Sequence, residues 1–189
     1  MQRIRDLQGL YSTLQGSVTE AIDFSDLLRS TIVLVVSALD FYIHSIVREN
    51  MLNTFIGNRP DTSSFLNFNV KIESVRRAIN DPSKTDWLYD EIYVQHGWKT
   101  FQQPDKIKEA LKLITTRIVW EEIAVPLGTT ATDLKNQLEL LVDRRNKIAH
   151  EADADPALPT QKLPIDIAIV TTAINFIEGI VRELDVILK

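Results

Sequence analysis

Hydrophobic residues recur at helical spacing along most of the chain, and no alternating polar and apolar run is long enough to require a sheet. Residues 2–15 carry a single apolar stripe. A long apolar segment begins at Ser25 or Asp26, either of which can cap a helix, and runs to about Thr54 before a stop at residues 56–60. The pattern predicts an all-α protein.

Shorter helices are expected in the middle of the chain. The apolar periodicity predicts helices over residues 64–80 and 86–96, and a helix opened by a proline over residues 104–125. The chain has 189 residues, which is long enough to bury a core without a metal or disulfide. We interpret residues 1–189 as a single domain with a helical insertion over about residues 55–126.

A further helix, capped by Thr130 or Thr132, is expected to last to about Glu151. Its apolar stripe comprises Leu134, Leu138, Leu141, Val142, Ile148 and Ala149. Arg145 projects from the middle of this stripe. Because an arginine does not lose its proton, it needs a carboxylate, a phosphate or an open cleft at such a position.

Polar side chains that suit phosphate chemistry surround this arginine. Asn146 and His150 lie four residues apart and therefore share a face of the helix. Arg144 and Lys147 complete a local basic cluster. The segment thus combines an always-charged anion binder, an amide and a group that transfers protons near neutral pH.

The chain after this helix is expected to form a loop and one last helix. Residues 153–164 contain three prolines and predict an extended loop in which Asp153 and Asp155 are exposed to solvent. The last helix is expected over residues 165–188. Its predicted apolar side comprises Ile169, Ala173, Phe176, Ile180 and Ile187.

The segment from Arg145 to His150 resembles the Arg-x-x-x-x-His signature of the HEPN superfamily, and the run over residues 27–50 is similar to the long second helix of its RiboL-PSP-like members. The resemblance implies a HEPN-like helical bundle, with the insertion between the second long helix and the motif helix. It further implies a ribonuclease with Arg145 and His150 as catalytic residues, assisted by Asn146, Arg144 and Lys147. Such ribonucleases complete their site at a two-fold interface, so a homodimer is expected.

The residue types fit RNA cleavage without a metal or other cofactor. This reaction needs the ribose 2′-hydroxyl deprotonated, the leaving 5′-oxygen protonated and the charge on the pentacoordinate phosphate stabilised. A histidine can serve either proton transfer, and a fixed guanidinium suits the phosphate oxygens. The resemblance places such an enzyme in a prokaryotic toxin-antitoxin or antiviral defence system, with RNA as substrate and an antitoxin or other regulatory protein as an expected partner.

Two alternatives remain open at this point. Arg145 can be a structural residue that pairs with Asp40 or Asp143, while His150 only interacts favourably with the helix C-terminus. The protein would then be a non-catalytic HEPN module that binds RNA or a nucleotide, or a dimerising subunit of a larger complex. The second alternative is that the chain is a helical bundle unrelated to this family, with a structural ion pair.

The long second helix carries a narrow polar seam of Ser37, Asp40, His44 and Arg48. The seam is either a solvated stripe or a surface that faces the motif helix or its symmetry mate. In the second case Asp40 would hold a cation and His44 would lie near the active cleft, as supporting residues.

Composition limits the classes of protein to which this chain can belong. A formal net charge of −5 argues against a protein that coats long nucleic acid, but it does not exclude one that cuts it at a local basic site. There is no cysteine, and the three histidines lack metal-ligand spacing, so no metal site is expected. Trp87, Trp98 and Trp120 are expected in the core rather than as base-stacking platforms. The polar N-terminus favours a cytoplasmic protein without a membrane span.

Overall fold

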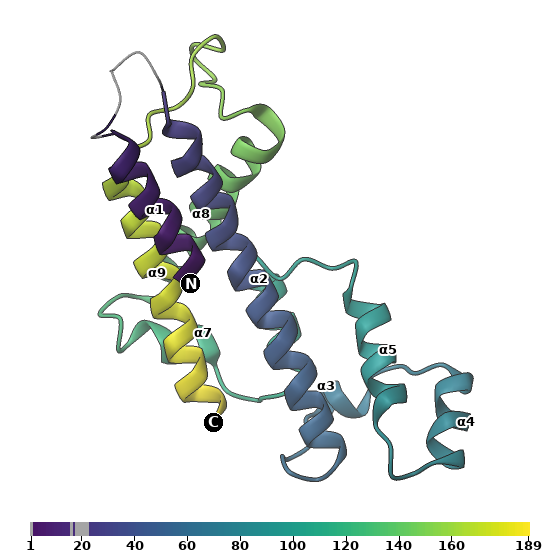
Figure 1. The fold of residues 1–189 in the computed structure, drawn as a ribbon. Coiled ribbons are helices and arrows are strands. Elements are labelled where there is room, and N and C mark those ends of the chain that lie inside the picture. Colours follow the sequence, from purple (N-terminus) through teal and green to yellow (C-terminus); the bar gives the residue numbers. More distant parts are fainter. Residues whose placement is uncertain (1, 16, 18–22) are drawn as a thin grey trace. The chain divides into compact units, whose positions relative to one another are not determined.

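The computed structural model describes residues 2–15, 17 and 23–189, and within them it contains nine helices and no strand (Figure 1). The helices are α1 (Gln2–Gln15), α2 (Ser25–Phe55), α3 (Ser63–Leu66), α4 (Ile72–Asn80), α5 (Asp86–His96), α6 (Pro104–Leu111), α7 (Val119–Ala124), α8 (Ala131–Glu151) and α9 (Ile167–Leu188). The all-α prediction is confirmed.

The chain divides into two compact units. One comprises residues 1–39 and 119–189, and the other comprises residues 40–118. Helix α2 therefore contributes its first half to one unit and its second half to the other. The second unit contains most of the segment that we interpret as an insertion, and the single-domain assignment stays a prediction.

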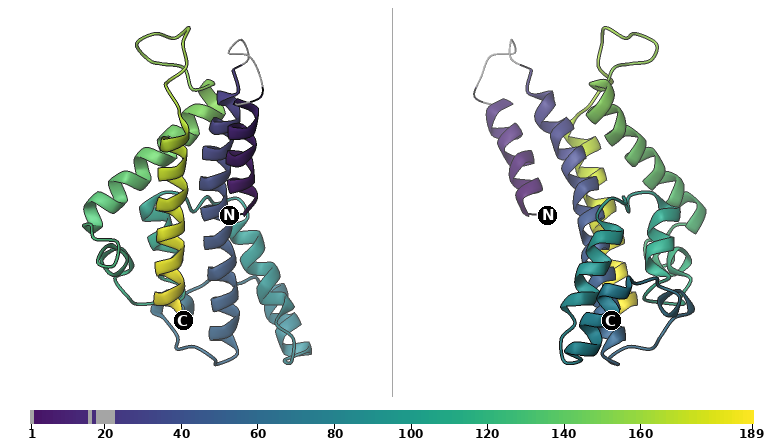
Figure 2. Two further views of the ribbon diagram at one scale, coloured as in Figure 1. Left: turned by 60° about the vertical axis from the view of Figure 1, so that its left-hand side comes forward. Right: turned by 90° about the vertical axis from the view of Figure 1, so that its right-hand side faces the viewer.

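The core of the first unit is formed by α2, α7, α8 and α9. Helix α7 packs against both α8 and α9. Helix α1 is joined to α9 by side-chain hydrogen bonds from Arg5 to Glu178 and from Gln8 to Thr171. In both views of Figure 2 the loop between α8 and α9 lies at one end of these two helices.

The buried faces of α8 and α9 differ in part from the predicted stripes. Leu134, Leu138 and Val142 of α8 are buried as expected, whereas Ala149 is exposed because the described chain leaves that side of the last turn uncovered. On α9 the buried face is centred on Val170, Ile174, Ile177 and Leu184. The predicted members Ala173, Ile180 and Ile187 are also buried, and Phe176 is half-buried. The prediction is wrong for Ile169, which lies near the start of the helix and is exposed.

The predicted helix over residues 64–80 is wrong in the middle, where α3 ends and α4 begins only at Ile72. The Asn67 side chain donates to the Ser63 carbonyl at 2.7 Å, and the Phe68 backbone N–H turns back to Phe65. Asparagine competes with the helix for backbone hydrogen bonds in this way. Local side-chain bonding therefore interrupts the apolar periodicity.

The predicted helix over residues 104–125 is also interrupted, between α6 and α7. The Thr62 hydroxyl, which comes from a distant part of the chain, bonds the carbonyls of Lys112 and Leu113 at 2.9 and 3.2 Å. The Thr115 hydroxyl accepts from the Arg117 backbone N–H at 3.2 Å. These bonds satisfy backbone groups that a continuous helix would have paired internally.

Other boundaries agree with the sequence. Helix α5 has the predicted bounds, and the Thr130 side chain caps α8 by accepting from the Asp133 backbone N–H at 3.1 Å. Helix α9 begins two residues later than expected, because the Asp166 carboxylate caps it and accepts from the Ile169 N–H at 2.8 Å. These ends follow the preference of short polar side chains for helix N-caps.

Among the helices of the described residues, α2 is long and apolar enough to cross a membrane. Length and composition alone do not identify a membrane span, because the core helix of a soluble protein can be equally long and apolar. The inner side chains of α2 are buried within the protein, with Leu28, Val35, Leu39 and Ile43 fully covered. The finding is therefore weak evidence for a membrane span.

Two predicted environments are wrong. Trp87 and Trp120 lie in the core as expected, but the side chain of Trp98 is 77% exposed, because it follows the end of α5 in an irregular segment. Asp153, which we expected in solvent, is 0% exposed. Both errors concern residues outside helices, where apolar periodicity carries no information.

Candidate functional site

The side chain of Arg145 lies half-buried on α8 and has no carboxylate partner among the described residues. Its Nη1 donates to the Asn146 Oδ1 at 2.9 Å, and its Nε is buried without a hydrogen-bond partner. A buried donor without an acceptor costs about 1–3 kcal/mol. The structural alternative, a pair between Arg145 and Asp143, does not form.

His150 occupies the last turn of α8, and its side chain is exposed. The Lys147 side chain lies one turn earlier and is half-buried, while its carbonyl accepts from the backbone N–H of Asp153 at 3.0 Å. His150 is therefore accessible at the C-terminal end of the motif helix, where a protonated imidazole also interacts favourably with the helix dipole.

Arg144 is placed quite differently from Arg145. Its Nη2 donates to the Asp153 Oδ2 at 2.7 Å, and the Arg29 Nε from the start of α2 donates to the same oxygen at 2.8 Å. Both guanidinium groups also bond the Leu163 carbonyl, at 3.3 and 2.8 Å. We call Arg29, Arg144 and Asp153 the Asp153 cluster. It joins α2, the end of α8 and the following loop.

The backbone supports this cluster by turning sharply after α8. Ala152 and Asp153 both adopt left-handed conformations, with φ of 51° and 60°. The turn directs the Asp153 carboxylate inward, and its carbonyl accepts from the Leu163 N–H at 2.8 Å. An aspartate tolerates this conformation better than most residues. This explains why the loop carries a buried carboxylate.

Sequence reasoning missed the Asp153 cluster, although a signal for it exists. Arg29 follows Leu28 directly on the predicted long helix, and both side chains are buried. A buried arginine requires a carboxylate within reach. The argument that singled out Arg145 therefore applied to Arg29 as well. Periodicity would have offered Asp26 as its partner, which lies 3.4 Å away, whereas the shorter bond to Asp153 comes from a distant loop.

Asp40 and His44 lie in the second unit and are brought together there. The Asp40 carboxylate accepts from the Phe101 backbone N–H and is 3.8 Å from the His44 Nε2. The same imidazole nitrogen donates to the Lys99 carbonyl at 3.3 Å. One turn on, the Arg48 guanidinium lies 4.7 Å from the centroid of the Tyr89 ring. Asp40 and His44 therefore anchor the segment between α5 and α6, and Arg48 contacts α5. The predicted supporting roles of Asp40 and His44 stay predictions.

Within residues 2–15, 17 and 23–189, no group of three histidine or carboxylate side chains is arranged to hold a metal ion. Arg145, Asn146 and His150 all lie in the last two turns of α8. By residue type, the guanidinium can bind an anion and the imidazole can exchange a proton.

The family model described as RiboL-PSP-HEPN matches residues 2–189, which is nearly the whole chain. No curated protein and no solved structure matches.

Proposed function

The chain belongs to the RiboL-PSP-HEPN family, and on this premise we propose that it is a metal-independent endoribonuclease with Arg145 and His150 as catalytic residues. The observation that carries the proposal is the unpaired state of Arg145. Its neighbour Arg144 is held by a buried carboxylate, whereas Arg145 bonds only Asn146. A cation kept half-buried without a carboxylate partner is poised to receive an anion from outside the chain.

The proposed reaction uses these groups in the ordinary way for RNA cleavage. The ribose 2′-oxygen loses its proton to a base and attacks the adjacent phosphorus, and the 5′-oxygen leaves with a proton from an acid. The products carry a cyclic 2′,3′-phosphate and a 5′-hydroxyl. The imidazole of His150 transfers one of these protons, and the Arg145 guanidinium stabilises the charge that develops on the phosphate oxygens. Asn146 orients the guanidinium through the bond described above.

We further propose that the site is completed by a second copy of the chain. One chain supplies one Arg145 and one His150, whereas the reaction needs two proton transfers and charge stabilisation. The same side of α8 that is buried at Leu138 and Val142 is uncovered at Ala149. A two-fold homodimer that joins two such surfaces would bring both motifs to one cleft.

The biological setting remains the one that the resemblance implies. We propose a cytoplasmic enzyme of a toxin-antitoxin or antiviral defence system, restrained by an antitoxin or other regulatory protein. Induced expression of the wild-type chain alone should then arrest growth, and Arg145→Ala should relieve the arrest at equal protein level. Equal growth arrest by both would contradict a toxic ribonuclease activity.

The catalytic assignment is tested by Arg145→Ala and His150→Ala. Each should lower the rate of RNA cleavage by roughly a hundredfold or more, because each removes an interaction with the transition state. Arg182→Ala is the matched control, since this arginine is an exposed residue of α9 that pairs with Glu183. Binding of RNA by a wild-type protein that never cleaves it would favour the non-catalytic HEPN module instead.

The composite site is tested by mixing the two inactive variants. If one active site takes Arg145 from one chain and His150 from its partner, exchange of subunits should restore part of the activity. Exchange is verified with chains that carry different affinity tags. Absence of recovery despite proven exchange would mean that each chain needs its own pair.

A further inference from the structure

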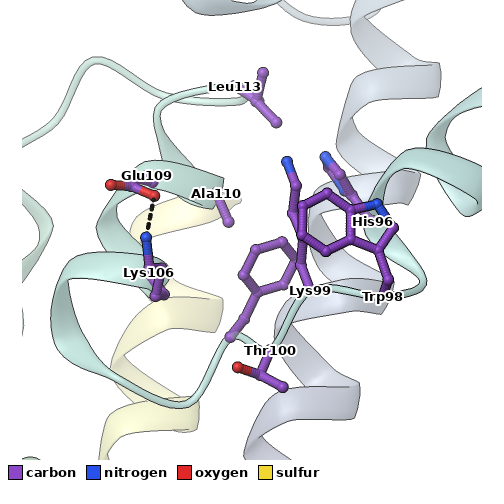
Figure 3. A pocket seen from close by; sticks show the side chains of 9 residues that line it. His96, Trp98, Lys99, Thr100, Lys106, Glu109, Ala110 and Leu113 are labelled. Atoms are coloured by element: carbon purple, nitrogen blue, oxygen red, sulfur yellow. Dashed lines mark hydrogen bonds and ion pairs between the residues drawn. The ribbon is translucent and has the colours of Figure 1, made fainter.

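A pocket of about 310 Å³ lies in the second unit, between the end of α5 and the helix α6 (Figure 3). The irregular segment after α5 forms one wall with Trp98, Lys99 and Phe101, and α6 forms the other with Lys106 and Glu109. Pockets that bind small molecules occupy roughly 300–1,000 Å³. This one therefore suits a single mononucleotide-sized ligand rather than a dinucleotide.

Of the two aromatic side chains that line the pocket, Trp98 is exposed and Phe101 is buried. The Trp98 indole is 77% exposed, and the Lys99 Nζ lies 5.6 Å from the centroid of its ring. Phe101, by contrast, is buried and meets the His96 ring edge-on at 5.4 Å. An exposed indole beside a hollow is suited to stack on a flat ring, and a base stacked on an aromatic side chain contributes about 1–3 kcal/mol.

His96 contributes a polar group that has no partner. It is 4% exposed, it lines the pocket, and its Nδ1 is buried without a hydrogen bond. Burial, with smaller contributions from Lys99 and His44, lowers its pKa to about 4. The imidazole is thus neutral near pH 7 and offers one donor and one acceptor. A base edge, which carries donors and acceptors itself, can bond such a group.

The charges at the rim favour an anion. Lys99 and Lys106 carry two positive charges, against one negative charge on Glu109. Lys106 bonds Glu109 at 3.2 Å on the surface of α6. Exposed pairs of this kind contribute at most about 1 kcal/mol, so a phosphate can displace the carboxylate from the ammonium group.

We propose that this pocket binds one nucleotide, either free or as an unpaired residue of an RNA chain, with the base stacked on Trp98 and the phosphate held by Lys99 and Lys106. The choice of a nucleotide over other flat anions rests on the proposed ribonuclease function. The binding itself does not depend on cleavage, because every residue of the pocket lies outside the Arg145 and His150 pair. A nucleotide held here would make the second unit a substrate-binding or regulatory site.

The test is a titration of the whole protein with AMP, GMP, CMP and UMP, followed by tryptophan fluorescence and calorimetry, with inorganic phosphate as the anion control. At least one nucleotide should bind more tightly than phosphate. Trp98→Ala and Lys106→Gln should each weaken its binding by about tenfold or more. Tyr93→Ala and Lys108→Gln are matched controls, since Tyr93 on α5 and Lys108 on α6 are exposed and do not line the pocket. They should leave binding unchanged.

Short single-stranded RNA distinguishes the two sources of the nucleotide. If the RNA chain is the ligand, a tetranucleotide binds more tightly than any mononucleotide, and Lys106→Gln raises KM for RNA while kcat is preserved. If a free nucleotide is the ligand, the mononucleotide binds more tightly and KM for RNA does not change. Binding by neither, or binding that Trp98→Ala leaves intact, overturns the inference. If the protein cleaves RNA but binds no nucleotide in this pocket, the proposed ribonuclease function stands and the pocket proposal fails. If it binds a nucleotide here but never cleaves RNA, the pocket proposal stands and the ribonuclease function fails.

Discussion

Arg144 and Arg145 are neighbours on α8, but their side chains have different hydrogen-bond partners. Arg144 shares the fully buried Asp153 carboxylate with Arg29, and its Nη2 also donates to two backbone carbonyls, although its Nε is buried without a partner. Arg145 bonds only the adjacent Asn146, and its Nε has no partner. Both side chains are partly covered by the protein. The contrast separates a cation that is paired within the fold from one that has no carboxylate partner among the described residues.

The Asp153 cluster also explains how the second arginine keeps its position. It joins the end of α8 and the following loop to the start of α2 through the Asp153 carboxylate. These bonds support the last turns of α8, which carry Arg145 and His150. Preorganised groups of this kind stabilise a transition state at little reorganisation cost.

The largest effect is expected from breaking the Asp153 cluster. Asp153→Asn should lower the free energy of unfolding by about 3–5 kcal/mol, because it removes the carboxylate that the buried Arg29 and the partly buried Arg144 share, and leaves Arg29 only its longer contact to Asp26 at 3.4 Å. Asparagine tolerates the left-handed backbone, so no strain is added. The melting temperature should fall by roughly 6–20 °C for a chain of this size. Asp155→Asn, in the same loop, is the control and should change it little.

A smaller effect separates the two arginines directly. Arg144→Ala should lower the free energy of unfolding by about 1.5–3 kcal/mol, since it removes charge-assisted bonds to a buried carboxylate. Arg145→Ala should leave the melting temperature level or raise it, because an unpaired buried charge does not stabilise the fold. Chemical denaturation of both variants measures the difference. Unfolding of the Arg145 variant would make this arginine structural and remove the contrast.

A pH-dependent effect extends the contrast to the second unit, where the unpartnered group is His96. Its folded-state pKa of about 4 lies below the ordinary value of 6.5, so the unfolded chain binds the proton first as pH falls. Stability from this group is complete above pH 6.5 and is lost toward pH 4, at no more than about 1.4 kcal/mol per pH unit. His96→Phe should remove this component of the pH dependence, and an unchanged slope would show that His96 titrates normally.

Much of the fold could be predicted from the sequence, because it depends on local signals. The bounds of α5 and the Thr130 cap follow from apolar periodicity and from the preference for short polar caps. The breaks before α4 and α7 could not be predicted in this way. They depend on Asn67 and on Thr62, whose hydroxyl bonds carbonyls about fifty residues further along the chain. Periodicity does not report such bonds.

In the candidate site, too, local features could be predicted from the sequence and contacts between distant residues could not. The unusual position of Arg145 was visible, because a charge within an apolar stripe is a local pattern. The partner of Arg144 was not, because Asp153 reaches it only through two consecutive left-handed residues in a proline-containing loop. The exposed Trp98 was missed for a related reason, since it lies in an irregular segment whose path is set by bonds to Asp40 and His44.

The central claim, that the unpaired Arg145 acts with His150 in RNA cleavage without a metal, is tested most directly by the ends of the RNA products. Purified protein is incubated with RNA in excess EDTA, with Arg145→Ala in parallel. We expect the wild-type protein to cleave RNA in the chelator and to leave cyclic 2′,3′-phosphate and 5′-hydroxyl ends. The Arg145→Ala variant should yield almost none of these products. Cleavage that EDTA abolishes and magnesium or manganese restores would contradict it.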